Sequence, residues 1–175
     1  FDLPTMYGQE YGYRSGLNAS MVKHLKGKAE KILKDVKLKS GDIVIDIAGN
    51  DGTFLGFFPE DCQLTSIDPT SEKFGKYFKP NVNYIADFFS ESVFKKRFGK
   101  QKAKVITSFS MFYDLEDPCE FAKQVKECLS PDGIWVLEQS YMPEMIRVNS
   151  FDTVCHEHLS YYGCLLYTSD AADEE

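Results

Sequence analysis

The stretch Val44–Gly52, which reads Val-Ile-Asp-Ile-Ala-Gly-Asn-Asp-Gly, decides the fold class of this 175-residue chain. It begins inside a short apolar run, residues 43–48, that is rich in β-branched side chains and typical of a strand buried on both faces of a parallel sheet. The run passes into small residues and a turn-forming Asn, which let the backbone come close to a ligand. The stretch therefore predicts a nucleotide-like cofactor site at the end of a first strand.

Four more apolar segments follow, each separated from the last by enough chain for a helix. The expected strands are residues 63–67, 82–86, 104–109 and 134–138. Apolar side chains at three- and four-residue steps predict a helix over 18–36. Further helices are expected from Gly52, after a cap at Ser71, from Ser90 to Arg97, and from Asp117 to the turn at 130–133. Strands and helices that alternate in this way form an α/β fold with a Rossmann-like, doubly wound parallel sheet.

The composition is typical of a globular protein, and it argues against two classes of partner. The net charge of −7 argues against a nucleic-acid partner, which requires a concentrated basic surface. No apolar run approaches the roughly 20 residues of a membrane span, so we expect no membrane partner. The five cysteines never form a C-x-x-C pair, which argues against a metal site and favours a reducing, cytoplasmic compartment.

The chain divides into three parts: an N-terminal segment and helix (1–40), a cofactor-binding domain (41–163) and a tail (164–175). The tail changes composition abruptly after Gly163 and resembles the translated read-through of a sequencing adapter, so we expect it to be non-native. The first residues lack a Met and a signal layout. We therefore expect the natural protein to extend beyond both ends.

Three carboxylates stand at the ends of the first three predicted strands. Asp46 lies in the first strand, Asp68 follows the second strand 22 residues later, and Asp87 follows the third. Asp68 is placed to accept the hydroxyls of a ribose, and Asp87 to meet an adenine amino group. Single acids after strands are usually caps or turn formers, and the set of three does not separate S-adenosylmethionine (SAM) from NAD.

Three motifs together resemble the class I SAM-dependent methyltransferases, and within them the sugar C-methyltransferases that act on nucleotide-linked keto-sugars. The turn departs from the D-x-G-x-G-x-G pattern, since Ala48 and Asn50 stand at the first two Gly positions, but Asn-Asp-Gly is similar to that subgroup. The motif Tyr11–Gly16 and the segment 152–162 resemble the subgroup's N-terminal and catalytic motifs. The resemblance covers roughly residues 5–163.

This resemblance implies a SAM site and assigns residues to it. The cofactor-binding residues implied are Asp46, Ala48, Gly49, Asn50 and Gly52 at the turn, Asp68 at the ribose, Asp87 and Phe88 at the adenine, and Ser108 and Phe109 near the methionine part. Phe109 fits a plain core position equally well. Tyr13 would close over SAM and substrate, or would pack as part of a tyrosine-rich hinge.

The Cys155-His156-Glu157-His158 cluster leaves three interpretations open. A metal site is disfavoured because Cys155 and the histidines would face opposite sides of a strand. A polar loop whose histidines satisfy buried backbone groups is the structural alternative. The third is acid–base catalysis, because forming an enolate for carbon methylation needs a base that titrates near neutral pH.

The resemblance assigns His158 as that base and Glu157 as its partner or as a sugar-binding group. The subgroup often has Tyr where Cys155 stands, so Tyr161 or Tyr162 would have to supply the phenol. An O- or N-methyltransferase of another small molecule, and a non-catalytic or NAD-binding Rossmann-like module, remain alternatives. The resemblance also places a zinc module before residue 1, and further strands and a further domain after Gly163. The present chain is therefore expected to bind SAM weakly and to expose a sheet edge.

Overall fold

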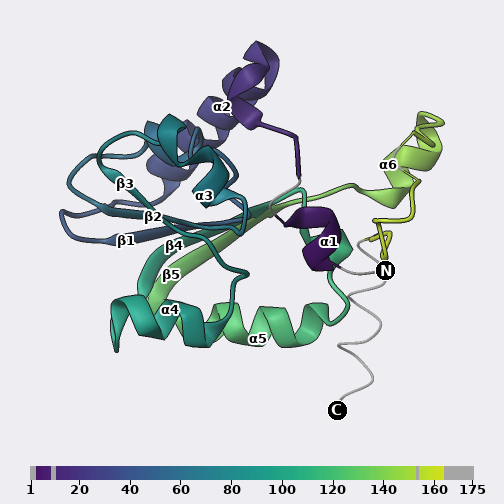
Figure 1. The fold of residues 1–175 in the computed structure, drawn as a ribbon. Coiled ribbons are helices and arrows are strands. Elements are labelled where there is room, and N and C mark those ends of the chain that lie inside the picture. The colour runs from purple at the N-terminus through teal and green to yellow at the C-terminus, as the bar shows by residue number, and fades with distance from the viewer. Residues whose placement is uncertain (1–2, 9–10, 153, 164–175) are drawn as a thin grey trace.

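The computed structural model describes residues 3–8, 11–152 and 154–163, which form a three-layer α/β unit (Figure 1). The strands are β1 (Ile43–Ile47), β2 (Gln63–Ile67), β3 (Val82–Ile85), β4 (Ala103–Phe109) and β5 (Leu129–Glu138). The helices are α1 (Leu3–Tyr7), α2 (Ala19–Asp35), α3 (Ser71–Phe74), α4 (Glu91–Phe98), α5 (Pro118–Cys128) and α6 (Met142–Arg147). None of these helices is long and apolar enough to cross a membrane.

The five strands form one sheet in the order β3-β2-β1-β4-β5, and every neighbouring pair is parallel. The predicted α/β fold with a parallel, doubly wound sheet is therefore confirmed. Strand β1 lies at the centre, and all of its residues are buried. Because parallel strands end at the same edge, the residues that follow β1, β2 and β4 come together there.

The two faces of the sheet are covered by different helices (Figure 1). Ile43, Ile45 and Ile47 of β1 belong to the core cluster that α4 and α5 complete. Val44 points to the other face, where it belongs to the cluster that contains Ala29 of α2. Burial on both sides explains why β1 reads as a continuous apolar run.

Two expected helix features are wrong. The chain after Gly52 forms only a 3-10 turn over Leu55–Phe57, because Gly56 weakens a helix and Pro59 ends it within a few residues. Ser71 does not cap α3: it is the first helical residue and is fully buried, with its hydroxyl 3.4 Å from that of Ser66. The caps at Ser90 and Asp117 are confirmed, since their side chains accept from the backbone N–H groups three residues later.

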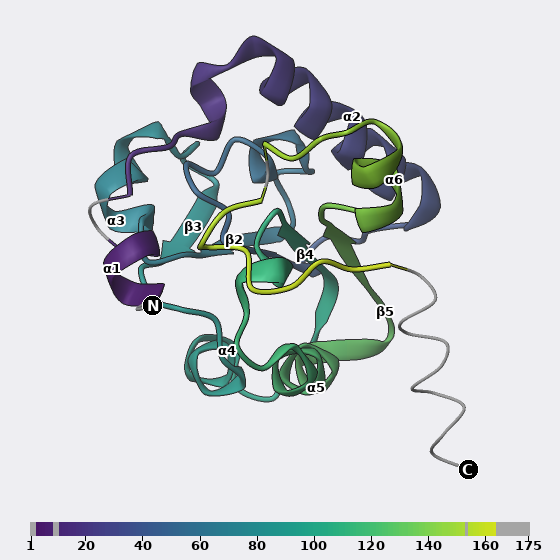
Figure 2. The same ribbon diagram turned by 90° about the vertical axis from the view of Figure 1, so that its right-hand side faces the viewer.

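Strand β5 begins earlier than predicted. Its register jumps from Ala103 opposite Leu129 to Val105 opposite Ile134, so the expected turn at 130–133 is an irregularity within the strand. Helices α1 and α6 were not predicted, and the tail 164–175 lies outside the described residues. Seen from the side in Figure 2, α1, α6 and the chain that follows α6 lie in front of the carboxyl ends of the strands.

Candidate active site

A cavity of about 620 Å³ opens at the carboxyl ends of the strands. A volume in this range suits a cofactor or a small substrate. The sequence-predicted residues that line it are Tyr13, Asp46, Ala48, Gly49, Asn50, Asp68, Phe88 and Phe109. The turn after β1, the end of β2 and the N-terminal tyrosine motif therefore meet at one site.

The turn after β1 adopts the left-handed backbone conformation at every second residue. The φ angles are +57° at Ala48, +53° at Asn50 and +73° at Gly52. Asn tolerates this region, whereas Ala pays a steric penalty of about 1 kcal/mol in it. The turn thus keeps the backbone that a glycine pattern would give, although only one of the three residues is glycine.

Gly49 lies where a side chain cannot fit. A Cβ added there would stand 2.6 Å from the Ser66 hydroxyl oxygen and 2.8 Å from Oδ2 of Asp46. Both neighbours are buried and belong to strands, so they cannot move aside without disturbing the sheet. The glycine is therefore required by the close packing of the turn on β1 and β2.

Asp46 is a buried acid at the floor of the cavity. Its pKa is raised from 3.8 to about 7, mainly by burial and to a smaller extent by the nearby Asp68 carboxylate, while the hydroxyl of Thr107, which donates to Oδ1 at 2.6 Å, acts in the opposite direction. A positively charged ligand in the cavity would favour the ionised form. The site therefore suits a cationic ligand.

Asp68 is fixed by three hydrogen bonds at the end of β2. Oδ1 accepts from the backbone N–H and the hydroxyl of Thr70, both at 2.6 Å, and Oδ2 accepts from the backbone N–H of Asn50 at 2.9 Å. A carboxylate offers about four lone-pair sites, so one remains for a ligand donor. Its orientation is set by the same turn that lines the cavity.

Three other predicted cofactor residues do not line the cavity. Asp87 is exposed and accepts from the backbone N–H of Phe88. Ser108 is fully buried, and its hydroxyl accepts from Nε1 of Trp135 at 2.9 Å. Gly52 packs on the Phe78 ring, where an added Cβ would stand 2.6 Å from the nearest carbon.

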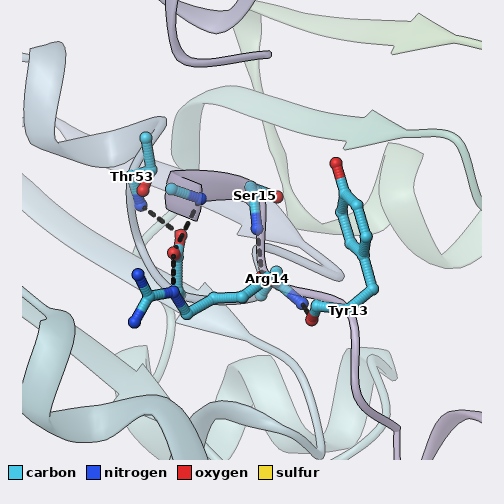
Figure 3. Close-up of polar contacts among 7 residues, drawn as sticks. Tyr13, Arg14, Ser15 and Thr53 are labelled. Carbon is cyan, nitrogen blue, oxygen red and sulfur yellow. Dashed lines mark hydrogen bonds and ion pairs between the residues drawn. The ribbon is translucent and has the colours of Figure 1, made fainter. Parts of the chain in front are cut away.

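The N-terminal tyrosine motif is bonded to the turn by the side chains of Asn50 and Asp51, a contact that the sequence analysis did not predict (Figure 3). Asn50 accepts from the backbone N–H of Ser15 at 3.0 Å and donates to the carbonyl of Tyr13 at 2.9 Å. Asp51 accepts from the backbone N–H of Gly16 at 2.9 Å and pairs with Arg14, whose Nε lies 3.4 Å away. Two motifs of the resemblance, about 35 residues apart, are therefore one structural unit.

The His-Glu-His segment lies beside the cavity rather than in its lining. The ring of His158 packs on that of Tyr113, a lining residue, with centroids 4.2 Å apart. The N–H groups of Leu159 and Ser160 both donate to the Tyr113 carbonyl, at 2.9 and 3.1 Å. Glu157, like His158, is half-buried and outside the lining.

The other groups of this segment lie away from the cavity. Cys155 and His156 are exposed, and within the described ranges no three His, Cys, Asp or Glu side chains gather as metal ligands would. Tyr162 is buried against Phe112, with ring centroids 5.5 Å apart, and neither it nor Tyr161 lines the cavity. The lining phenols come instead from Tyr7, Tyr11, Tyr13 and Tyr113.

Asp114 is a site residue that the sequence did not reveal. It lies in the 3-10 turn after β4, lines the cavity and is only 6% exposed. Burial raises its pKa to about 6, while the hydrogen bond from the Tyr7 phenol and the charge of His158 act to lower it. Its Oδ1 is buried without a hydrogen-bond partner among the residues that the structure describes. Asp114 thus offers an acceptor to a ligand next to His158.

Comparison with known proteins decides the family. Residues 21–164 match the methyltransferase domain family. The chain belongs to this family. The fold and the expected cofactor, SAM, agree with that membership.

One curated relative is the C-methyltransferase NovU of Streptomyces niveus, which is 26% identical over 174 residues. The match covers 95% of this chain but only 41% of NovU, so the chain spans less than half the length of that relative. Two solved structures share the fold. One is the YcgJ protein of Bacillus subtilis (TM-score 0.62, 18% identity, 86% of this chain and 67% of that chain), and the other is the plantazolicin methyltransferase BpumL in complex with a triazolic desmethylPZN analog and S-adenosylhomocysteine (SAH) (TM-score 0.58, 18% identity, 83% and 57%).

Proposed function

We propose that this chain is the cofactor-binding core of a SAM-dependent C-methyltransferase that acts on a nucleotide-linked keto-sugar. The observation that carries the proposal is the packing of His158 on Tyr113, which brings a base to the wall of a cavity at the carboxyl ends of the strands. The similarity to NovU, a C-methyltransferase, supports carbon as the methyl acceptor. The second, keto-sugar part of the proposal rests on the motifs at Asn50–Gly52 and 152–162.

The cavity fits SAM because the cofactor carries positive charge. Asp46 and Asp68 are buried acids at one end of the cavity, and Phe88 offers an exposed aromatic face for an adenine. Ala48, Gly49 and Asn50 would pass beside the cofactor, with Gly52 shaping the turn from behind. Asp87 and Ser108 do not line the cavity, but the residues that follow them, Phe88 and Phe109, do. When bound, SAM supplies a methyl group on a positively charged sulfur.

In the proposed reaction His158 removes a proton from the carbon next to the substrate carbonyl. The electron pair of the broken C–H bond forms an enolate, and its carbon then bonds the methyl group as the methyl–sulfur bond breaks. Asp114 stabilises the charged imidazolium, and a lining phenol such as Tyr11 donates to the enolate oxygen. Glu157 orients His158 or binds a sugar hydroxyl. The proton on His158 is finally released to water.

The alternative is methylation of an oxygen or nitrogen in another small molecule. Methyltransferases of the same fold include the plantazolicin enzyme BpumL, so the fold leaves the acceptor open. The enolate mechanism differs from this alternative in needing a base close to a carbon acid. Among the described residues, the features that favour it are His158 and the adjacent Asp114.

The test is methyl transfer from radiolabelled SAM to a panel of nucleotide-linked 4-keto-sugars by the full-length protein. We expect label on sugar carbon, and a loss of at least about 100-fold in kcat for His158→Gln, as is usual when a general base is removed. His156→Gln is the matched control, because it changes an exposed histidine of the same segment. Undiminished transfer by His158→Gln would remove that residue from its role, and label on oxygen or nitrogen would favour the alternative.

A further inference from the structure

The turn after β1 has two sides with different partners. Ala48, Gly49 and Asn50 line the cavity, and the side chains of Asn50 and Asp51 bond to the backbone of residues 13–16. Tyr13 and Ser15 of that segment line the cavity in turn. The same few residues of the turn therefore contact both the cavity and the segment 13–16.

Asn50 connects the two sides most directly. Its backbone N–H donates to Asp68, the acid at the end of β2, while its side-chain amide bonds Ser15 and Tyr13. Both side-chain atoms of the amide are used, one as acceptor and one as donor, so neither Asp nor Ala can replace it fully. A turn-forming role alone would require neither hydrogen bond.

Asp51 and Arg14 strengthen the same connection. Asp51 is 2% exposed, and its Oδ1 also accepts from the backbone N–H of Thr53 at 3.1 Å (Figure 3). Arg14 lies between this carboxylate and Tyr77, with its guanidinium carbon 3.7 Å from the ring centroid. A buried acid that is bonded in this way holds its partners firmly, because freeing them would leave its charge without compensation.

We propose that Asn50 and Asp51 are positioning residues that hold residues 13–16 across the cavity, so that cofactor binding at the turn and closure of the cavity are coupled. Closure keeps water away from the cofactor and holds the cofactor in the cavity during the reaction. Coupling is reciprocal. A ligand that stabilises the turn also stabilises the closed segment, and release of the segment lowers the affinity for the ligand. The coupling rests on the part of the proposed function that places SAM at this turn.

The test is Asn50→Gly, which removes both amide hydrogen bonds and leaves a residue that adopts positive φ freely. Trypsin cleavage after Arg14 reports release of the segment, and it is measured by mass spectrometry on the full-length protein with and without SAH. We expect cleavage about tenfold faster than in the natural protein, because two net stabilising hydrogen bonds are lost. We also expect SAH to slow cleavage of the natural protein and to lose this effect, together with affinity, in Asn50→Gly.

Ala48→Gly is the matched control, because it places a glycine in the same turn without touching residues 13–16; cleavage at the natural rate is expected. A second pair keeps the test decisive if Asn50→Gly folds poorly. A Cβ at Gly16 would stand 2.6 Å from Oδ2 of Asp51, whereas one at Gly12 would meet no atom of the described residues within 4 Å. Gly16→Ala should therefore accelerate cleavage after Arg14, and Gly12→Ala should not.

Cleavage at the natural rate in both Asn50→Gly and Gly16→Ala would overturn the proposal and leave Asn50 as a turn former. Faster cleavage in these two variants with unchanged SAH affinity would overturn the coupling. A natural protein that binds no SAH would count against the proposed function instead, and the cleavage rates would still decide whether the two residues hold the segment.

Discussion

The turn after β1 lines the cavity and the segment 154–163 lies beside it, and the molecule holds the two in different ways. The turn is mostly buried, and its groups bond to partners 18 to 37 residues away in sequence. The described part of the segment is held by two N–H groups on one carbonyl, by the ring contact of His158 and by Tyr162, which forms a bridge with Tyr141. The turn is thus set by the sheet, whereas the segment 154–163, the proposed substrate side, is more exposed and is expected to open at lower cost in free energy.

The largest expected effect comes from adding one methyl group to the turn after β1, compared with adding one to the segment 154–163. Gly49→Ala forces a Cβ against Ser66 and Asp46, which should destabilise the fold by about 1–3 kcal/mol and abolish measurable SAH binding. Gly163→Ala is the comparison, because the nearest atoms that its Cβ would meet in the described part of the chain belong to Pro143 and Met142, none closer than 3.6 Å. Denaturant unfolding and calorimetric titration measure both. Equal effects at the two glycines would contradict the difference between the regions.

On the substrate side, Asp114→Asn should lower kcat about tenfold and leave SAH affinity unchanged, because it removes a charge that stabilises the imidazolium of His158. Since the pKa of Asp114 is raised to about 6, the carboxylate forms as pH rises through 6, and kcat should rise with it. The pH profile of kcat measures this: it should rise in two steps in the natural protein, one of them near pH 6, and in a single step in Asp114→Asn, because the general base must still lose its proton. Two steps in the variant would assign the titration near pH 6 to another group.

On the proposed cofactor side, Asp46→Asn should raise the free energy of unfolding at pH 8 and lower the affinity for SAH. The folded-state pKa of about 7 lies above the unfolded value near 4, so the folded protein holds the proton more tightly. The contribution of the Asp46 carboxyl group to the free energy of unfolding is then greatest below pH 4, and it falls as pH rises toward 7. The Asn oxygen can still accept from Thr107 without a charge to bury, so the gain of the variant should grow over the same range. Unfolding at pH 4, 6 and 8 checks the sign; a gain that shrinks with pH would refute it.

The sequence predicted the sheet well because each buried strand carries its own local signal of apolar, β-branched residues. It also predicted two caps, since a cap acts over three residues. The helix expected from Gly52 is wrong because Gly56 and Pro59 limit the chain there to a 3-10 turn, and the cap expected at Ser71 is wrong because this residue is already helical and its hydroxyl is buried beside that of Ser66. Sequence patterns therefore predicted the features that depend on neighbouring residues, such as the buried strands and the two caps.

The site was predicted unevenly for the same reason. Ala48, Gly49 and Asp68 line the cavity because strand ends converge, which topology alone implies. The bonds of Asn50 and Asp51 to residues 13–16 join positions about 35 residues apart, and spacing in one sequence does not reveal such pairs. Asp114 was missed because nothing in the sequence of Met111–Glu116 indicates that Asp114 is buried while Glu116 is not.

Hydrogen exchange of the substrate tests the central claim most directly, because it isolates the base from methyl transfer. A nucleotide-linked 4-keto-sugar is incubated in D₂O with the full-length protein and SAH, and the proton next to the carbonyl is followed by NMR. We predict exchange at the carbon that is later methylated, lost in His158→Gln and kept in His156→Gln. Methyl transfer to carbon with no exchange, or exchange that is equal in the two variants, would contradict a mechanism in which His158 forms the enolate.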